Sequence, residues 1–267
     1  MIGRPGRLVL LGRSLAHSRS PQFQNAALRA AGIPLTYELL DIPASALEDT
    51  LALLARARAA GNITVPYKEQ VFARCDRVSE VAERAGAVNT FWFQHGELVG
   101  DNTDVAGFVQ SVEQLLGGAP SECTIGVLGA GGAAAAVLTA ISQWRHCRAL
   151  LHNRTPDRAV ALCARFSSVA SLSDASGLAR ASDLVVNATT IGLRDDELPI
   201  APDALRTDAA VLDLVYRQGE TAWVRAARAS GRRAADGLTM LVEQGAAAFE
   251  RWFGFFPDRR VMWESLR

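Results

Sequence analysis

Short apolar runs with the length of β-strands alternate with longer helix-like segments along the whole chain. In the first part of the chain this alternation predicts strands, helices and one hairpin. We expect strands at residues 7–12, 35–42 and 61–65, a hairpin at 89–100, and helices at 20–31, 44–60, 68–74, 78–86 and 105–116. Alternation of this kind favours α/β architecture with parallel sheets.

The same rhythm restarts after a glycine-rich segment at residues 117–120, which is the best candidate for a linker. We expect strands at 124–128, 149–153, 184–187 and 210–215, helices at 133–144 and 157–166, and a long returning helix at 239–252. The predicted fold class is therefore α/β with two domains. One is a Rossmann-type doubly wound domain, and the other is an α/β domain with a mainly parallel sheet.

Length and charge narrow the class of protein. The chain has 267 residues, of which 49% are hydrophobic, so two domains can each bury a core. Its formal net charge is zero at pH 7. Proteins that bind nucleic acid or anionic membranes through their overall charge carry a basic excess, so we expect neither partner here.

The cysteines and the longest uncharged stretch bear on the cellular compartment. No cysteine pair has C-x-x-C or zinc-ligand spacing, and the histidines show no metal spacing, so we expect no metal. We favour free thiols and a reducing, cytoplasmic location; the alternative is two disulfides. The uncharged stretch at 124–144 is long enough for a membrane span, but its clustered glycines predict a strand, a turn and a helix.

A glycine-rich turn follows the first strand of the second half. Gly129, Ala130, Gly131, Gly132 and Ala133 begin a G-x-G-x-x-A pattern between a predicted strand and a predicted helix. Small residues let the backbone approach a pyrophosphate, and the helix N-terminus supplies free N–H groups. The pattern predicts a dinucleotide-binding loop; the alternative is an Ala/Gly-rich packing turn.

The end of the next predicted strand distinguishes between dinucleotides. An NAD site usually places a carboxylate there, whereas this strand ends in Asn153, Arg154 and Thr155, with Arg158 soon after. A guanidinium binds phosphate through bidentate, charge-assisted hydrogen bonds. We therefore predict NADP(H) as cofactor, with Arg154 as the stronger candidate because Arg158 can equally be a solvated helix residue.

The chain contains a single lysine, Lys68, among 28 basic residues. Lysine can release and retake a proton near neutral pH when it is buried, and arginine cannot. Lys68 follows a predicted strand end, where α/β sites gather, and is the candidate general acid for reducing a carbonyl. Asp104 can pair with it and hold its position. The alternatives are a chance remnant for Lys68 and a helix cap for Asp104.

At these residues the chain resembles the shikimate dehydrogenase family. The matching segments occur in family order and span nearly the whole chain. They are 17–21, 62–68, 86–90, 100–104, the glycine loop, 153–155, 187–189, Tyr216 and 237–245.

The resemblance implies reversible, NADP-dependent reduction of 3-dehydroshikimate to shikimate, a step of aromatic amino acid biosynthesis. It implies a discontinuous substrate domain, 1–104 plus 238–267, and an NADP-binding domain, 105–237. By family pattern Lys68 and Asp104 are the catalytic pair, and Gly237 joins residues 129–133, 153–155 and 158 in binding the cofactor. Ser18, Ser20 and Tyr216 hold the substrate carboxylate, and its ring hydroxyls are held by Asn62, Thr64, Asn89 and Gln244. Taken singly, each of these polar residues also has an ordinary role in a cap, a turn or a solvated face.

Some positions depart from the family pattern. Ser14 stands where proline is usual, Gln24 stands where histidine is usual, and Ala222-Trp223 replaces a usual Pro-Leu. These departures leave open a quinate/shikimate dehydrogenase, or a paralogue acting on a related cyclohexane carboxylic acid. A non-catalytic NADP(H) sensor is the alternative from another class. A monomer and a homodimer are both compatible with the sequence.

Overall fold

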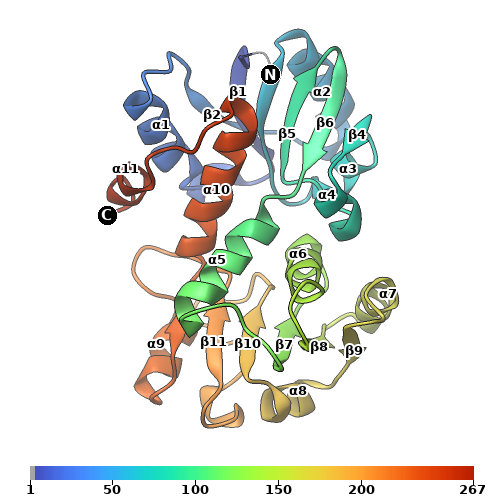
Figure 1. Cartoon of the computed structure of the whole chain (residues 1–267), viewed down its shortest axis with the longest axis vertical. Helices are drawn as coiled ribbons and strands as arrows, with labels where there is room; N and C mark the ends of the chain where they lie inside the picture. Colours follow the sequence, from blue (N-terminus) through green and yellow to red (C-terminus); the bar gives the residue numbers. More distant parts are fainter. Residues whose placement is uncertain (1–3) are drawn as a thin grey trace. The chain divides into compact units, whose positions relative to one another are not determined.

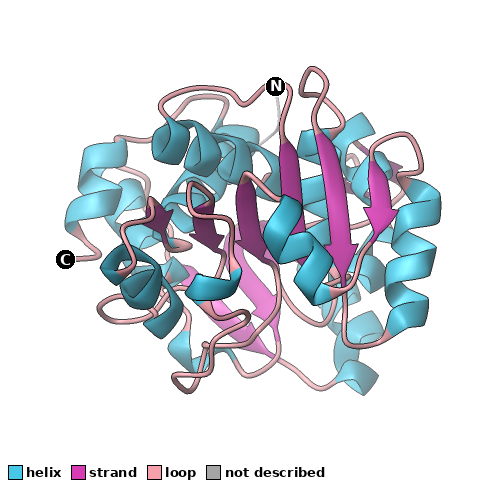
Figure 2. Cartoon of the chain, turned by 90° about the horizontal axis from the view of Figure 1, so that it is seen from below, coloured by secondary structure: helices cyan, strands magenta, loops and turns pink. Residues whose placement is uncertain are grey.

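The computed structural model describes residues 4–267 and divides the chain into two compact units (Figures 1 and 2). The first unit comprises Met1–Gly107 and Leu241–Arg267, and the second comprises Phe108–Met240. Residues 1–3 of the expected substrate domain lie outside the described residues. Both units alternate helices and strands, so the chain is an α/β protein as the hydrophobic pattern predicts.

Within the described residues, the first unit contains a six-stranded mixed sheet in the order β2-β1-β3-β5-β6-β4. β1 pairs in parallel with both β2 and β3, and β4 pairs in parallel with β6. The predicted hairpin forms β5 and β6, and β5 pairs antiparallel with β3 as well as with β6. The strands are β1 (Arg7–Gly12), β2 (Tyr37–Asp41), β3 (Ala59–Ile63), β4 (Arg77–Val78), β5 (Thr90–Gln94) and β6 (Glu97–Asp101).

Helices lie beside these strands (Figure 1). They are α1 (Ser20–Ala30), α2 (Leu47–Arg56), α3 (Lys68–Phe72), α4 (Glu80–Ala85) and α11 (Arg259–Glu264), with short 3-10 turns η1 (Leu15–His17) and η2 (Ala44–Ala46). Pro21 occupies the first turn of α1, where a backbone N–H has no acceptor within the helix, so proline costs no helical hydrogen bond there.

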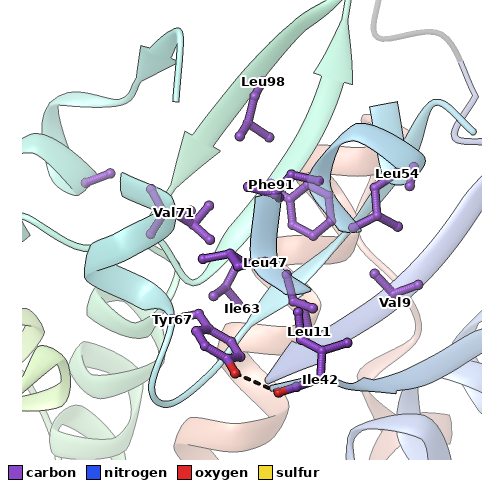
Figure 3. Close-up of a cluster of buried hydrophobic side chains, with 14 residues drawn as sticks. Val9, Leu11, Ile42, Leu47, Leu54, Ile63, Tyr67, Val71, Phe91 and Leu98 are labelled. Atoms are coloured by element: carbon purple, nitrogen blue, oxygen red, sulfur yellow. Dashed lines mark hydrogen bonds between the residues drawn. The ribbon is translucent and has the colours of Figure 1, made fainter. Parts of the chain in front are cut away.

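One buried cluster links strands and helices in the first unit (Figure 3). Leu11 and Ile63 from the sheet lie in the same cluster as Leu54 of α2 and Val71 of α3. The ring of Tyr67 is fully buried in this cluster, and its hydroxyl donates a 2.6 Å hydrogen bond to the carbonyl of Ile42. This anchor fixes the start of α3, and hence the position of the residue that follows Tyr67.

The second unit contains, within the described residues, a six-stranded sheet in which every pairing is parallel, in the order β12-β11-β10-β7-β8-β9. Read from its β9 edge, the chain order is three-two-one-four-five-six, which is the order of a Rossmann-type doubly wound sheet. The strands are β7 (Thr124–Leu128), β8 (Arg148–His152), β9 (Ala170–Leu172), β10 (Leu184–Asn187), β11 (Ala210–Asp213) and β12 (Ala234–Ala235).

The helices of this unit are α6 (Gly132–Ile141), α7 (Pro156–Arg165), α8 (Ala175–Ala181) and α9 (Ala222–Ala229), with the 3-10 turn η3 (Pro202–Ala204). One core cluster packs Leu178 of α8 and Trp223 of α9 against Val185 and Val211 of the sheet. The topological switch point lies between β7 and β10, beside the glycine-rich turn that follows β7.

The boundary between the units falls within two long helices. These are α5 (Asp104–Leu116) and α10 (Leu238–Phe253). The glycine-rich segment at 117–120, predicted as a linker, therefore lies inside the second unit. Among residues 4–267 there is no helix with the length and apolarity that a bilayer crossing requires.

The predicted helix at 44–60 is wrong at its end. The alanine-rich sequence favours helix, but α2 stops at Arg56 and the backbone turns at Arg58, whose φ is +47°. Ala59 and Ala60 then pair with β1 and are fully buried, so sheet pairing overrides helix propensity. As a result β3 covers Ala59–Ile63 instead of the predicted 61–65.

Candidate active site

The single lysine of the chain is paired with a carboxylate in the first unit. Lys68 is the first residue of α3, and Asp104 is the first residue of α5. Lys68 Nζ donates a 2.5 Å hydrogen bond to Asp104 Oδ2, and the two side chains are 16% and 8% exposed. The pair is therefore largely shielded from water, while the ammonium keeps some access for a reacting atom.

Asn89 and Asp104 meet through a polar network. Asn89 Nδ2 lies 2.8 Å from Asp104 Oδ1, 3.0 Å from Thr103 Oγ1 and 3.2 Å from Gln244 Oε1. The backbone N–H of Thr103 donates to Asn89 Oδ1 at 2.7 Å. One amide nitrogen has two hydrogens for three acceptors, so it cannot serve all three at once, and the acceptor that it leaves free can accept a hydrogen bond from an incoming hydroxyl.

A second amide extends this network toward β1 and β2. Asn62 Nδ2 donates to the carbonyl of Asn89 at 3.1 Å, and Asn62 Oδ1 accepts from the hydroxyl of Tyr37 at 2.8 Å. Asn62 and Tyr37 are buried. The structure thus links five of the residues that sequence reasoning selected, namely Asn62, Lys68, Asn89, Asp104 and Gln244.

The first unit also contains Ser18, Ser20 and Thr64. These residues make contacts outside the network around Asn89. Ser18 Oγ accepts from the backbone N–H of Ser20 at 3.3 Å, and Ser20 begins α1. Thr64 directly follows β3, and its backbone N–H donates to Leu11 at 2.9 Å. Gln24 of α1 donates at 3.0 Å to the carbonyl of Gly245, which ties α1 to α10 one residue beyond Gln244.

Tyr216 and Gly237 lie in the second unit, beyond the end of β11. The backbone N–H of Gly237 donates to the carbonyl of Val215 at 3.0 Å. A Cβ on Gly237 would lie 2.3 Å from the carbonyl oxygen of Leu214, so only glycine permits this approach. Gly237 therefore holds the chain close to the end of β11.

Sequence reasoning missed three residues that organise these sites. Tyr37 and Thr103 position the two amides of the first unit, as described above. Asp213 ends β11 and is fully buried, where Asn187 Nδ2, the Val215 N–H and Thr221 Oγ1 all donate to it. Burial raises the pKa of this carboxyl despite those donors. A polar residue at the end of a buried strand was the only signal available for Asp213.

The glycine-rich turn of the second unit begins directly after β7. Gly129 has φ +111°, a conformation that side chains rarely adopt, and its N–H donates to the carbonyl of His152 at 2.8 Å. A Cβ on Gly129 would lie 2.8 Å from the carbonyl oxygen of Ala188. The turn therefore lies against the ends of both β8 and β10.

The N-terminus of α6 fits a bound anion. Gly131 is its N-cap, no side chain caps the helix, and its first turn contains no acidic residue. A Cβ on Gly131 would meet no heavy atom within 4 Å, so open space lies beside it. Free N–H groups and the helix dipole favour negative charge there, which suits a dinucleotide pyrophosphate near Ala130, Gly132 and Ala133.

Two guanidinium groups lie beyond the end of β8. Arg154 and Arg158 are exposed, and neither forms an ion pair with any carboxylate among residues 4–267. Asn153 Nδ2 donates to the carbonyl of Thr155 at 2.8 Å, which shapes the turn before α7. The Gly129 N–H donates a hydrogen bond to the carbonyl of His152, so the turn before α7 lies next to the glycine loop. The unpaired guanidinium groups of Arg154 and Arg158 suit the phosphate that distinguishes NADP from NAD.

In the described part of the chain, no group of three or more His, Cys, Asp or Glu side chains could hold a metal ion. The polar network of the first unit offers a proton donor and several ligands for hydroxyl groups. The glycine turn of the second unit offers a binding site for an anion.

Three segments of the chain match known protein families. Residues 10–91 match the shikimate dehydrogenase substrate binding domain, residues 111–194 match shikimate / quinate 5-dehydrogenase, and residues 237–267 match the shikimate 5'-dehydrogenase C-terminal domain. The matches fall in both described units. The first of them contains Lys68 and most of the amides around it.

Individual relatives match over nearly the full length. A shikimate dehydrogenase (NADP(+)) of Thermus thermophilus is 40% identical, over 98% of this chain and 97% of the relative. The crystal structure of shikimate 5-dehydrogenase from Thermus thermophilus in complex with NADP(H) and shikimate has a TM-score of 0.89 over 98% of each chain. A quinate dehydrogenase from Corynebacterium glutamicum, solved with NAD, is 31% identical, with a TM-score of 0.86 over 97% of each chain. From identity, coverage and fold together, the chain belongs to the shikimate dehydrogenase family.

Proposed function

We propose that the protein catalyses the reversible, NADP-dependent reduction of 3-dehydroshikimate to shikimate. The observation that carries this proposal is the pair of Lys68 and Asp104, joined through Asn89 to Gln244. A proton donor beside neutral amides is what the reduction of a ring ketone on a polyol requires. Full-length relatives named shikimate dehydrogenase (NADP(+)) support the same substrate and cofactor.

The cofactor supplies hydride to the carbonyl carbon when it is bound. Residues 129–133 would hold its pyrophosphate, and Asn153, Arg154, Thr155 and Arg158 would hold the adenosine phosphate. Gly237 would contact the cofactor as well. The free N-terminus of α6 and the unpaired guanidinium groups support this assignment. We accordingly assign NADP binding to the second unit, and the amides and hydroxyl that would hold the substrate ring to the first.

Residues of the first unit would transfer the proton. In reduction, Lys68 donates a proton to the oxygen of the reacting carbonyl, and in oxidation its neutral amine takes the proton back. Asp104 holds the amine in place through Oδ2 and keeps its second oxygen on Asn89. The carboxylate can therefore hold the lysine side chain in one position in both directions of the reaction.

Substrate recognition divides by chemistry. Neutral amides and a hydroxyl, from Asn62, Thr64, Asn89 and Gln244, suit the ring hydroxyls because they donate and accept. Ser18, Ser20 and Tyr216 would donate to the carboxylate, as the family pattern implies. A site built this way rejects analogues that lack a hydroxyl, because buried polar groups are then left unpaired.

We further propose a cytoplasmic enzyme that acts as a monomer or homodimer, and the unbonded cysteines support a reducing compartment.

The decisive test follows NADPH absorbance with purified protein, shikimate and NADP⁺. We expect NADPH to form, and formation to be slower when quinate replaces shikimate or NAD⁺ replaces NADP⁺. Faster turnover of quinate with NAD⁺ would identify a quinate dehydrogenase instead. NADPH binding without turnover of either acid would indicate a non-catalytic sensor.

A further inference from the structure

Two cysteines of the second unit lie side by side at the start of its central strands. Cys123 directly precedes β7, and Cys147 directly precedes β8. β7 and β8 are parallel neighbours (Figure 1), with Thr124 opposite Arg148. The N–H of Arg148 donates to the carbonyl of Cys123 at 3.0 Å, so the pairing extends to the cysteines themselves.

The two thiols are in direct contact. Cys123 Sγ and Cys147 Sγ are 3.0 Å apart, and both cysteines are unbonded. Neighbouring strands in a sheet are about 4.8 Å apart. That spacing lies within the range of about 4.4–6.8 Å that Cα atoms span across a disulfide. A bond between these sulfurs therefore needs a small side-chain movement and no displacement of the sheet.

The thiols differ in access. Cys147 is only 6% exposed, and its Sγ donates to the carbonyl of Pro120 at 3.6 Å. Cys123 is partly exposed and lines a cavity of about 180 Å³, together with Leu116, Pro120, Ile125 and Arg206. A small reagent can enter this cavity and reach Cys123 first, with Cys147 behind it.

We propose that Cys123 and Cys147 form a modification site, at which a small peroxide converts the two thiols into an intramolecular disulfide. This site is separate from the proposed catalytic residues and does not depend on the proposed function. The proposed hydride transfer uses neither of these two thiols.

The reaction balances in two steps. Cys123 sulfur attacks one oxygen of hydrogen peroxide, the O–O bond breaks, and the thiol proton leaves with the released hydroxide as water, leaving a sulfenic acid. Cys147 sulfur then attacks Cys123 sulfur, the S–O bond breaks, and its thiol proton leaves with hydroxide as a second water. Two thiols are oxidised by two electrons, and one peroxide is reduced to two waters.

Proximity, and not acidity, distinguishes this pair. Burial is the largest cause that raises the pKa of Cys123 to about 12, so little thiolate exists at neutral pH and the first step needs peroxide in excess. Burial likewise raises the pKa of Cys75 to about 12, but Cys75 is the only cysteine of the first unit. Cys75 therefore provides a control thiol whose pKa is raised to the same extent, but which has no second cysteine in its unit.

The test treats the full chain with excess hydrogen peroxide and maps cysteines by alkylation and peptide mass spectrometry. We expect one peptide pair joined through Cys123 and Cys147, lighter by two hydrogen atoms than the reduced pair, and separated again by dithiothreitol. Cys75→Ser and Cys163→Ser should retain this product, whereas Cys123→Ser and Cys147→Ser should lose it. Oxidised wild-type protein should also melt at a higher temperature than reduced protein, and Cys147→Ser should show no such rise.

Two results would overturn the proposal. One is complete alkylation of both cysteines in folded wild-type protein after peroxide treatment. The other is oxidation of Cys123 to a sulfinic acid with Cys147 still reduced. Because these readouts come from the wild-type chain, they remain decisive even if a serine variant fails to fold.

Discussion

Lys68 and Asp104 form a 2.5 Å hydrogen bond in which the carboxylate uses one oxygen for the ammonium and the other for Asn89. Asp104 therefore connects the proposed proton donor to the amide network that reaches Gln244. A lysine held at a single position can be aimed at one substrate oxygen. Positioning of this kind lowers the entropic cost of proton transfer.

Substitution of Lys68 by arginine should abolish most turnover while leaving cofactor binding intact. Arginine keeps the positive charge and can still pair with Asp104, but it does not release its proton near neutral pH. We expect kcat to fall by about 10²–10⁴-fold. NADPH affinity, measured by fluorescence titration, should stay unchanged because the proposed cofactor residues lie in the other unit. Wild-type turnover in this variant would contradict the acid assignment.

Tyr37→Phe should weaken substrate binding without removing any proposed substrate ligand. The lost hydroxyl donates to Asn62 Oδ1 at 2.8 Å, so the amide would be held only through its other hydrogen bond, from Nδ2 to the carbonyl of Asn89. A hydrogen bond of this kind contributes about 1–1.5 kcal/mol, which corresponds to a rise in KM for shikimate of about 5–13-fold. Steady-state kinetics with saturating NADP⁺ measure this change.

Tyr67→Phe is the matched control for Tyr37→Phe. Its hydroxyl is equally buried but donates to the carbonyl of Ile42, within the core cluster of Figure 3. We expect this variant to lose about 1 kcal/mol of unfolding free energy and to keep the wild-type KM. Equal changes in KM for both variants would mean that Tyr37 acts through stability alone.

The sequence alone was sufficient for the strongest elements of the fold. β7 and β10 have the predicted bounds, because each is a fully buried apolar run with polar or glycine residues after it. The glycine turn after β7 was equally visible, since its pattern requires special backbone geometry at Gly129. Lys68 could be selected because the chain contains no other lysine.

Other features depend on contacts between distant residues. Tyr37 belongs to the site because its hydroxyl reaches Asn62, 25 positions along the chain. Thr103 looked like part of a polar turn, and only its bonds to Asn89 show that it orients an amide. Ala59 and Ala60 form a strand because β1 is beside them, which their own propensity does not indicate. Such tertiary effects are not encoded in local patterns.

Gly131→Ala and Gly129→Ala should separate cofactor binding from stability. A methyl group on Gly131, whose φ is −106°, meets no protein atom within 4 Å, so the folded state should tolerate it. That methyl would instead take up space beside the helix N-terminus where we place the pyrophosphate. We expect NADP⁺ binding to weaken by about 1.4 kcal/mol or more, which is tenfold in Kd, with little change in melting temperature.

Gly129→Ala should instead destabilise the fold. Its φ of +111° is strained for alanine, and the new Cβ would lie 2.8 Å from the carbonyl oxygen of Ala188. Strain of this kind costs about 1–3 kcal/mol in unfolding free energy, measured by urea denaturation. Equal loss of stability in both variants would show that the loop has a packing role only.

Arg154→Ala should reduce discrimination between the two dinucleotides. The guanidinium is exposed and unpaired within residues 4–267, so its removal breaks no protein contact. A charge-assisted bond to phosphate contributes about 1.5–3 kcal/mol, so Kd for NADP⁺ should rise by about 10–150-fold. Kd for NAD⁺, which lacks that phosphate, should change little, and isothermal titration calorimetry measures both. Equal weakening of both dinucleotides would remove the phosphate role.

Asp213 should make the stability of the second unit depend on pH in an identifiable direction. Burial raises the pKa of its carboxyl above the ordinary value of 3.8 in spite of donors from Thr221, Val215 and Asn187. A carboxyl whose pKa is higher in the folded state binds more protons there than in the unfolded state. Its contribution to stability is therefore lost as the pH rises from about 3.8 through the folded pKa, and then stays constant.

Asp213→Asn removes this titration while keeping the shape of the side chain. Urea denaturation of wild type and variant across this pH window should show the wild-type advantage in unfolding free energy shrinking as pH rises. Subtracting the two curves cancels the other titrating groups, because they are shared by both chains. A wild-type advantage that grows with pH would mean that the three donors outweigh burial, and that Asp213 is ionised more readily in the folded protein than in the unfolded one.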